Sequence, residues 1–205
     1  MKRILTLLIA ACTLAPLAAA AQPQFAYSEI KPPLQVETDG KIEVLEFFWY
    51  GCIHCYNLEP PLESWLKNLP PDVHFRRVPA VFNERWGHDA AIFYTFEALG
   101  VLDKLHRPFF DAIHRDRLRT DSPPALDQWL EKNGIEPRRF NDTMKSFSVQ
   151  SKLRRATQLT LSYRIDGTPA MAVQGRYTVS ADQGRSQKGM LDTVDFLVDM
   201  VRKKK

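Results

Sequence analysis

The sequence predicts an α/β fold that is interrupted by a helical insertion. Three observations lead to this prediction: a strand–helix–strand pattern at residues 42–78, a region from 83 to 160 with helical patterns and no convincing strand, and two short strands followed by an amphipathic helix after residue 169. The 205 residues are 44% hydrophobic and 25% charged, a composition that allows an ordinary globular core.

The N-terminal segment has the parts of a secretory signal peptide. Lys2–Arg3 is basic, Ile4–Leu17 is mostly apolar, and Ala19 with Ala21 supplies the small-residue cleavage pattern. We therefore expect cleavage after Ala21 and export of the mature chain. The alternative is a lipoprotein box that ends at Cys12, but it would leave an apolar segment of only about seven residues, at the lower limit for a signal peptide.

The strand–helix–strand pattern begins at residue 42. Ile42–Trp49 is a β-rich, mostly apolar run, which is typical of a strand buried on both faces. Cys52–Leu69 has apolar residues at helical spacing, although Pro60 and Pro61 inside it predict a kink or a division into two segments. Val73–Val78 alternates with period two and predicts the next strand. We expect a βαβ unit with a right-handed crossover.

The middle of the chain is helical, and strands return near the end. Ala170–Val173 and Tyr177–Val179 flank Gln174–Gly175, which predicts a hairpin. The last helix is expected to bury an apolar face that includes Met190 and Val201. The helices expected in the middle region cover approximately residues 90–98, 102–113, 123–133, 140–147 and 150–163.

The cysteine count indicates redox chemistry. After removal of the signal peptide, the chain keeps only Cys52 and Cys55. A disulfide across two intervening residues closes almost no loop and removes little entropy from the unfolded chain, so it is a poor structural crosslink. A zinc site would need a second ligand pair, which the mature chain lacks among its cysteines. Covalent haem attachment is excluded, because Tyr56 stands where a histidine would be required.

The position of the pair suits disulfide exchange. It follows a buried strand and opens a helix, so Cys52 lies at the helix N-terminus, where free amide groups and the helix dipole stabilise a thiolate. Cys55 lies one turn further and is expected to be more buried. We therefore expect Cys52 to be the nucleophile, attacked by substrate thiols, and Cys55 to resolve the mixed disulfide.

The charge pattern excludes one class of partner. The net charge is +4, and the predicted signal peptide removes two positive charges and no acids, which leaves +2 for the mature chain. No basic stripe is present, so we expect no nucleic-acid partner. Lys203–Lys205 is interpreted as a solvated helix end, with a membrane-surface patch as the alternative.

Three motifs carry a resemblance to a known family: Glu46–Tyr56, Ala98–Val101 and Gly167–Met171. With these motifs the mature chain resembles the DsbA-type periplasmic disulfide oxidoreductases, which have a thioredoxin fold interrupted by an inserted all-helical domain. The family's usual proline after the first cysteine is replaced by Ile53. Thr168 occupies the position before the cis-proline, where the best-known member of the family has valine. Both positions influence the redox potential or partner binding in this superfamily.

The resemblance implies a domain organisation and a location. The expected segments are a signal peptide at 1–21, the first part of the thioredoxin fold at 22–82, the helical insertion at 83–150 and the second part at 151–205. The expected location is the periplasm.

Further residues complete the expected redox site. His54 lies between the cysteines, where its ring can donate a hydrogen bond to the Cys52 thiolate or place positive charge beside it. Glu46 lies in the buried strand, where it can relay the proton that Cys55 must lose or gain; the alternative is a salt-bridged or solvated carboxylate. The resemblance implies that Pro169 is a cis-proline that packs against the Cys52–Cys55 disulfide.

Substrate binding is expected beside the cysteine pair. A cis bond before Pro169 leaves the backbone of Thr168 free to pair with an extended substrate segment. Five aromatic side chains are candidates for an apolar substrate groove, with a place in the core as the alternative for each: Trp49, Tyr50, Tyr56, Phe82 and Trp86.

The predicted function is an oxidoreductase that donates its disulfide to newly exported proteins with free thiols. As the resemblance implies, a quinone-linked membrane protein of the DsbB type would reoxidise it. We expect a monomer without cofactor or metal. Two alternatives remain. The first is a disulfide reductase or isomerase, although isomerases of this kind usually carry a dimerisation domain and we see no segment of this chain that could form one. The second is a peptide-binding chaperone with incidental cysteines.

Overall fold

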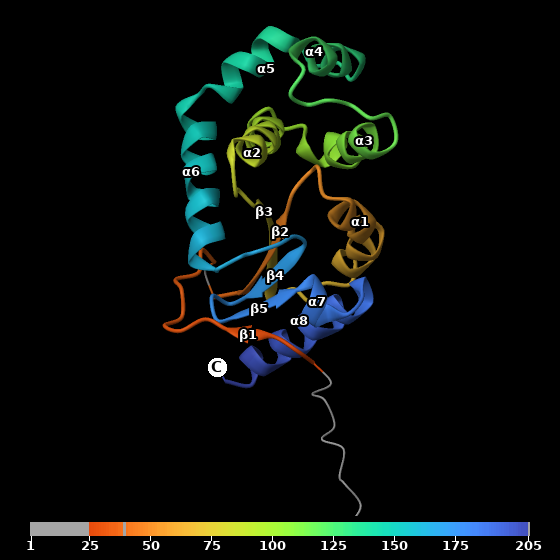
Figure 1. Ribbon diagram of the computed structural model, residues 1–205. Coiled ribbons are helices and arrows are strands. Elements are labelled where there is room, and N and C mark those ends of the chain that lie inside the picture. Colours follow the sequence, from red (N-terminus) through yellow and green to blue (C-terminus); the bar gives the residue numbers. More distant parts are fainter. Residues whose placement is uncertain (1–24, 39, 205) are drawn as a thin grey trace, which may run out of the picture.

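The computed structural model describes residues 25–38 and 40–204 (Figure 1). The predicted signal peptide at 1–21, with Cys12, lies outside the described residues. A sheet with the strand order β1-β5-β4-β2-β3 forms the centre of the fold. Its strands are β1 (Ser28–Glu29), β2 (Ile42–Phe48), β3 (Val73–Pro79), β4 (Ala170–Val173) and β5 (Tyr177–Ser180).

The strand pairing confirms the predicted βαβ unit and hairpin. β2 is parallel to β3 and antiparallel to β4, which in turn pairs with β5 in an antiparallel hairpin. Helix α1 (Ile53–Leu66) connects β2 to β3. It continues through Pro60 and Pro61 as one helix, so of the two predicted alternatives the division into two segments is wrong and the kink remains a prediction. The carbonyl groups that these prolines leave without an N–H partner belong to Tyr56, which is half-buried, and to Asn57, which is exposed.

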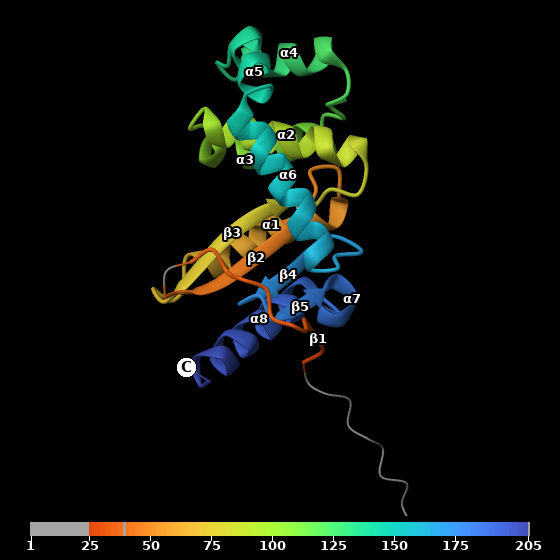
Figure 2. The same cartoon turned by 90° about the vertical axis from the view of Figure 1, so that its left-hand side faces the viewer.

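The predicted helical insertion is confirmed as a block of helices above the sheet (Figures 1 and 2). The last helix leaves this block and runs down beside the sheet. It begins at Phe147 rather than at Gln150, because Ser146 caps it by accepting a hydrogen bond from the amide of Val149. The helices are α2 (Glu84–Ala98), α3 (Leu102–His114), α4 (Pro123–Lys132), α5 (Pro137–Met144) and α6 (Phe147–Ser162).

Both faces of β2 are buried, as the sequence predicts. Leu45 and Phe47 belong to the core shared with the helical block and α6. Ile42 and Val44 point to the opposite face, where they pack with α1 and the C-terminal helix α8 (Gln187–Arg202). A short helix, α7 (Ala181–Gly184), precedes α8. This burial holds the end of β2, and with it the cysteine pair, between the sheet and the helical block.

Within the part of the chain that the structure describes, no helix combines the length and apolar character needed to cross a bilayer.

Candidate redox site

Cys52 occupies the N-cap position of α1. Its backbone is extended, with φ −85° and ψ 116°, and its amide donates to the carbonyl of Trp49 at 3.0 Å. The Cys52 sulfur accepts the amide N–H of Cys55 at 3.4 Å, which places it where a serine or aspartate oxygen normally caps a helix. A negative charge on this sulfur is therefore stabilised by the first turn of the helix.

The two thiols have opposite environments and form no disulfide in this structure. A hydrogen bond from the Cys55 thiol is the largest cause that lowers the pKa of Cys52 to about 5; burial opposes it, and Thr168 and the amides of Cys55 and His54 contribute further. Burial raises the pKa of Cys55 well above its ordinary value, and the neighbouring Cys52 and Glu46 add to this effect. At neutral pH, Cys52 is a thiolate and Cys55 a thiol.

Thr168 and Pro169 lie directly beside this pair. The Cys52 sulfur is 3.3 Å from the carbonyl oxygen of Thr168, to which its thiol form donates. The peptide bond between Thr168 and Pro169 is cis, as predicted, and Pro169 is buried. The fold therefore brings Thr168 to the reactive sulfur from a distant part of the sequence.

His54 acts on Cys52 in a way that the sequence did not predict. Its side chain is exposed, and the group of His54 that contributes to the lowered pKa of Cys52 is the backbone amide. A direct role for the imidazole remains a prediction.

Glu46 is completely buried and belongs to a cluster of charges. Its Oε2 lies 3.2 Å from Nε of Arg77, without the alignment of a regular hydrogen bond, while Nη2 of Arg77 donates to both carboxylate oxygens of Glu59 at 3.1 and 3.3 Å. Burial raises the pKa of Glu46 to about 8; Arg77 opposes the shift, and Glu59 and Cys52 increase it. Glu59 and Arg77 are not among the site residues predicted from the sequence, although a charged side chain in each of these largely apolar segments was a signal.

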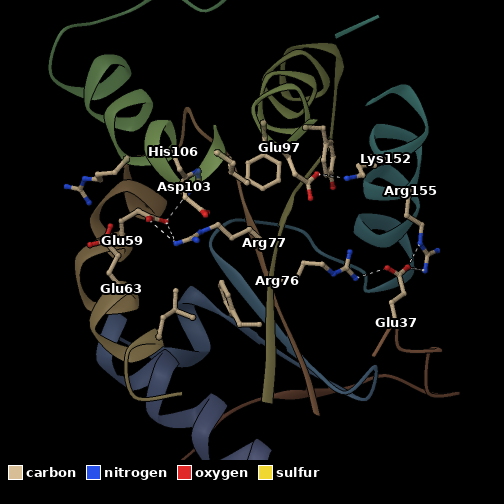
Figure 3. A pocket seen from close by; sticks show the side chains of 16 residues that line it. Glu37, Glu59, Glu63, Arg76, Arg77, Glu97, Asp103, His106, Lys152 and Arg155 are labelled. Carbon is tan, nitrogen blue, oxygen red and sulfur yellow. Dashed lines mark hydrogen bonds and ion pairs between the residues drawn. The ribbon is translucent and has the colours of Figure 1, made fainter. Parts of the chain in front are cut away.

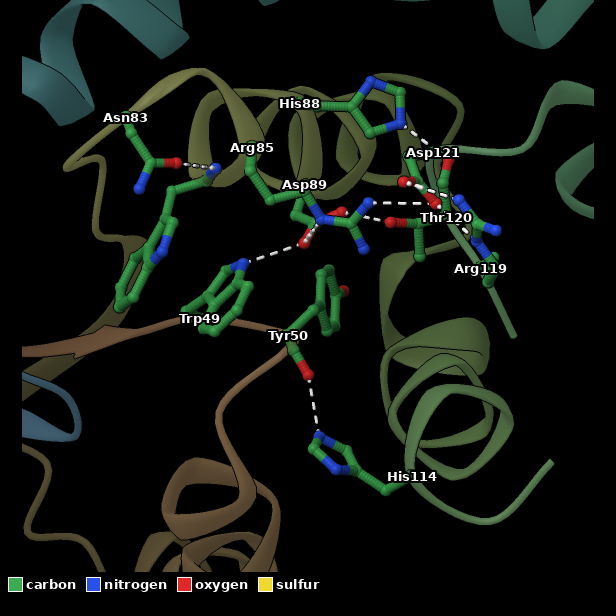
Figure 4. A network of polar contacts seen from close by, with 11 residues as sticks. Trp49, Tyr50, Asn83, Arg85, His88, Asp89, His114, Arg119, Thr120 and Asp121 are labelled. Atoms are coloured by element: carbon green, nitrogen blue, oxygen red, sulfur yellow. Dashed lines mark hydrogen bonds and ion pairs between the residues drawn. The ribbon is translucent and has the colours of Figure 1, made fainter. Parts of the chain in front are cut away.

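Trp49 belongs to an aromatic platform beside the cysteine turn (Figure 4). Its indole Nε1 donates to Oδ2 of Asp89 at 2.8 Å, and its ring stacks on Trp86 with centroids 4.3 Å apart. Phe82, which is 42% exposed, packs on Trp86 with a centroid separation of 4.6 Å. A Cβ atom on Gly51 would lie 2.3 Å from the Trp49 ring, so only glycine fits beneath it.

Tyr50 does not line a substrate groove, and that prediction is wrong. Its side chain is 1% exposed and packs among aromatic residues of the helical block, because residue 50 points from the end of β2 into the core. Its hydroxyl contacts Nδ1 of His106 at 2.9 Å. Its carbonyl accepts from Nε2 of His114 at 2.8 Å (Figure 4). Tyr56 is partly buried, with its hydroxyl donating to Asp111 at 2.7 Å.

A cleft of about 580 Å³ opens on the side of the cysteine turn where Thr168 lies. His54, Thr168 and Pro169 line it together with Asp182 and Met190. A segment of another protein that approaches Cys52 from this side would follow the backbone of Thr168. In residues 25–38 and 40–204, no three His, Cys, Asp or Glu side chains gather in a group that could hold a metal ion.

Comparisons with known proteins agree over most of the chain. A family model described as a DSBA-like thioredoxin domain matches residues 77–191, a span that begins after the cysteine pair. The thiol:disulfide interchange protein DsbA of Bordetella parapertussis is 42% identical over 196 residues, which cover 95% of this chain and 93% of the relative. The protein of the same name from Pseudomonas aeruginosa is 35% identical over 202 residues, covering 97% and 96%.

Solved structures show the same similarity. The crystal structure of Pseudomonas aeruginosa DsbA superposes with a TM-score of 0.83 at 34% identity, covering 88% of this chain and 94% of that one. The oxidoreductase DsbA from Xylella fastidiosa gives a TM-score of 0.80 at 32% identity, covering 86% and 95%. The architecture of a sheet with an inserted helical block is thus shared with these proteins.

Proposed function

The chain belongs to the DSBA-like thioredoxin family and is a thiol:disulfide oxidoreductase, and from this premise we propose that it donates a Cys52–Cys55 disulfide to newly translocated proteins. The observation that carries the proposal is the contrast between the two sulfurs. Cys52 is partly exposed with a lowered pKa, and Cys55 is buried with a raised pKa. An oxidant needs this contrast, since Cys52 must be reached and must leave easily while Cys55 must be shielded.

The reaction runs in two exchanges. A substrate thiolate attacks the Cys52 sulfur of the disulfide, so that a mixed disulfide forms and Cys55 leaves with the electron pair and takes up a proton. A second substrate thiolate then attacks the substrate sulfur of the mixed disulfide, and Cys52 leaves as a thiolate. Two electrons pass to the protein. Each unit by which the pKa of Cys52 is lowered favours the reduced form by about 1.4 kcal/mol, or roughly 30 mV for a two-electron couple.

Glu46 is the proposed source of the proton that Cys55 takes up. The proposal is supported by its burial, by its effect on the pKa of Cys55, and by its own pKa of about 8, which keeps it protonated at neutral pH. A protonated carboxyl beside a leaving thiolate serves as a general acid.

Substrates are proposed to bind as extended, thiol-containing segments. The backbone of Thr168 offers hydrogen bonds of the β type, Pro169 shapes the wall beside Cys52, and the Trp49 platform offers apolar contact without sequence specificity. Such recognition suits many unfolded partners.

The biological setting is also a proposal. We place the mature protein in the periplasm, because the N-terminal sequence has the pattern of a secretory signal peptide. We also propose that it acts as a monomer. Each donation leaves a dithiol, so turnover requires an oxidant, and we propose a membrane protein of the DsbB type. The boundaries 22–82, 83–150 and 151–205 remain predictions, and position 150 lies within α6.

The proposed function is tested by the redox equilibrium of the cysteine pair with glutathione, combined with two variants. Cys52→Ser should abolish oxidation of a reduced substrate protein, whereas Cys55→Ser should accumulate mixed disulfides through Cys52 because the resolving sulfur is gone. Normal oxidation by Cys55→Ser, or an equilibrium as reducing as that of a typical reductase, would overturn the proposal. Binding of unfolded peptides that survives alkylation of both thiols, without any thiol oxidation before alkylation, would instead identify a chaperone.

A further inference from the structure

A buried chain of polar contacts extends from Glu46 to His106 of α3. Arg77 lies between Glu46 and Glu59, and Nε2 of His106 donates to Oε1 of Glu59 at 3.4 Å. The hydroxyl of Tyr50 contacts the other ring nitrogen of His106 at 2.9 Å. Figure 3 shows His106, Glu59 and Arg77 converging from α3, α1 and β3.

This chain ends at a second cleft. The cleft measures about 550 Å³ and is lined by residues that include His106, Glu59 and Arg77, but not Glu46. None of its lining residues also lines the cleft beside Cys52. His106 therefore reaches solvent on a different side from the one at which substrate is proposed to bind, while Glu46 is 0% exposed.

We propose that His106 and Glu46 share one exchangeable proton across this cluster, which makes His106 a positioning residue for the proton step at Cys55. The inference rests on the proposed function and deepens it. When Glu46 gives its proton to the leaving Cys55 sulfur, His106 takes up a proton from water in the second cleft. When Cys55 returns its proton to Glu46 during reoxidation, His106 releases its own. No proton passes through Arg77, so the coupling between His106 and Glu46 is electrostatic.

The charges of the cluster favour this sharing. The positive charge of Arg77 balances the negative charge of Glu59. The cluster is therefore neutral in two states: with Glu46 protonated and His106 neutral, or with Glu46 ionised and His106 protonated. With neither protonated the cluster holds a net charge of −1, and with both it holds +1. A buried site disfavours either net charge, because desolvation penalises uncompensated charge strongly.

The Tyr50 hydroxyl can form a hydrogen bond with both the neutral and the protonated form of His106. When the ring is neutral, its Nε2–H donates to Glu59 and its Nδ1 accepts from the Tyr50 hydroxyl. When the ring is protonated, Nδ1–H donates to the same hydroxyl oxygen after rotation of the O–H bond. Each form therefore keeps two hydrogen-bonding partners without movement of heavy atoms.

The charges around His106, and the directions in which the pKa values of His106 and Glu59 are shifted, agree with competition between His106 and Glu46 for one proton. Besides Glu59 and Arg77, His106 is influenced by Glu63 of α1, and Asp103 and Arg107 of α3 line the same cleft. Burial lowers the pKa of His106, with the hydrogen bond to Glu59 opposing it. Burial would raise the pKa of Glu59, but His106 and Arg77 outweigh it and keep this carboxylate ionised.

The test compares His106→Gln, Glu46→Gln and the double variant between pH 5 and 8. The rate measured is single-turnover formation of the mixed disulfide from the oxidised protein and a cysteine-containing peptide. We expect His106→Gln to slow the reaction about tenfold, equivalent to about 1.4 kcal/mol, and to remove a limb of the pH profile. In the Glu46→Gln background the same substitution should cost little more, since the shared proton is already lost. His74→Gln, an exposed histidine on β3, should behave like the unsubstituted protein.

An unchanged pH profile in His106→Gln, or losses that multiply in the double variant, would overturn the inference. If His106→Gln fails to fold, NMR titration of the unsubstituted protein decides instead: the Glu46 carboxyl carbon and the His106 ring should respond in the same two steps. Independent single steps would contradict the sharing. A protein that oxidises no thiol at all would refute the proposed function, and the NMR result would still stand on its own.

Discussion

The sulfur of Cys52 lies 3.3 Å from the carbonyl oxygen of Thr168, although 116 positions separate the two residues in the sequence. The antiparallel pairing of β2 with β4, in which Phe47 faces Ala170, creates this proximity. The end of β2 leads into the cysteine turn, and the start of β4 follows the Thr168–Pro169 segment. A shift in this strand register would separate the two halves of the site.

The lowered pKa of Cys52 predicts how the stability of the reduced protein depends on pH. The pKa of Cys52 falls from an ordinary value of 9.0 to about 5 in the folded state. The thiolate therefore stabilises the folded protein fully above about pH 9, and this stabilisation is lost as the pH falls toward 5. Because the sulfur is partly exposed and solvent screens it, we expect a loss of about 1–3 kcal/mol in the free energy of unfolding rather than the full shift.

Urea denaturation of the reduced protein at pH 8 and pH 5 checks this expectation. Cys52→Ser is the matched control, because its hydroxyl oxygen replaces the sulfur as the N-cap acceptor and removes the titration. The reduced protein should lose more stability than Cys52→Ser when the pH is lowered. Equal losses in both proteins would mean that the thiolate does not stabilise the fold.

Sequence patterns predicted the parts of the fold that depend on local periodicity. β2 and the β4–β5 hairpin agree with the predicted segments to within a residue or two, because burial on both faces and turn residues leave a local signature. The start of α6 was missed by three residues, since the cap at Ser146 was read as part of a continuing helical pattern.

The charged part of the site could not be predicted in the same way. Glu59, Arg77 and His106 come from a helix, a strand and a helix of the insertion, and only the tertiary fold brings them together. Tyr50 was misassigned because its position beside the cysteine turn is close in sequence, while the direction of its side chain into the core depends on where β2 ends.

Asp89 is predicted to hold the Trp49 platform in place. Its buried carboxylate accepts from the Trp49 indole at 2.8 Å and from the Thr120 hydroxyl at 2.5 Å (Figure 4). Asp89→Ala leaves both donors without a partner, which we expect to destabilise the protein by about 1–3 kcal/mol. The loosened platform should lower kcat/KM for a reduced substrate protein severalfold and leave oxidation of a small dithiol unchanged.

Kinetics with both substrates, together with urea denaturation, tests this prediction. Asp142→Ala, an exposed aspartate on α5, provides the control for loss of a carboxylate in the helical block. If Asp89→Ala oxidises the protein substrate at the normal rate, the platform has no part in substrate binding.

The Thr168–Pro169 segment predicts a separation between protein substrates and small thiols. The β4 ladder with β2 begins at Ala170, so the backbone of Thr168 is outside the ladder and its carbonyl faces Cys52. A substrate segment that crosses Cys52 can therefore add a short β-type pairing along Thr168.

Pro169 is buried and has no N–H group, whereas Pro169→Ala introduces a buried donor and releases the restriction on φ. We expect the position of the Thr168 carbonyl to become variable. If two hydrogen bonds of about 1 kcal/mol each are weakened, kcat/KM for a cysteine-containing peptide falls roughly tenfold or more, while a small dithiol, which needs only the sulfur, is oxidised within about twofold of the normal rate. Stopped-flow measurement with both substrates gives the two factors, and Pro70→Ala, at an exposed proline in the loop between α1 and β3, should change neither. Equal slowing of the peptide and the small dithiol by Pro169→Ala would show that the proline affects the reactivity of Cys52 itself, and the proposed pairing along Thr168 would have to be abandoned.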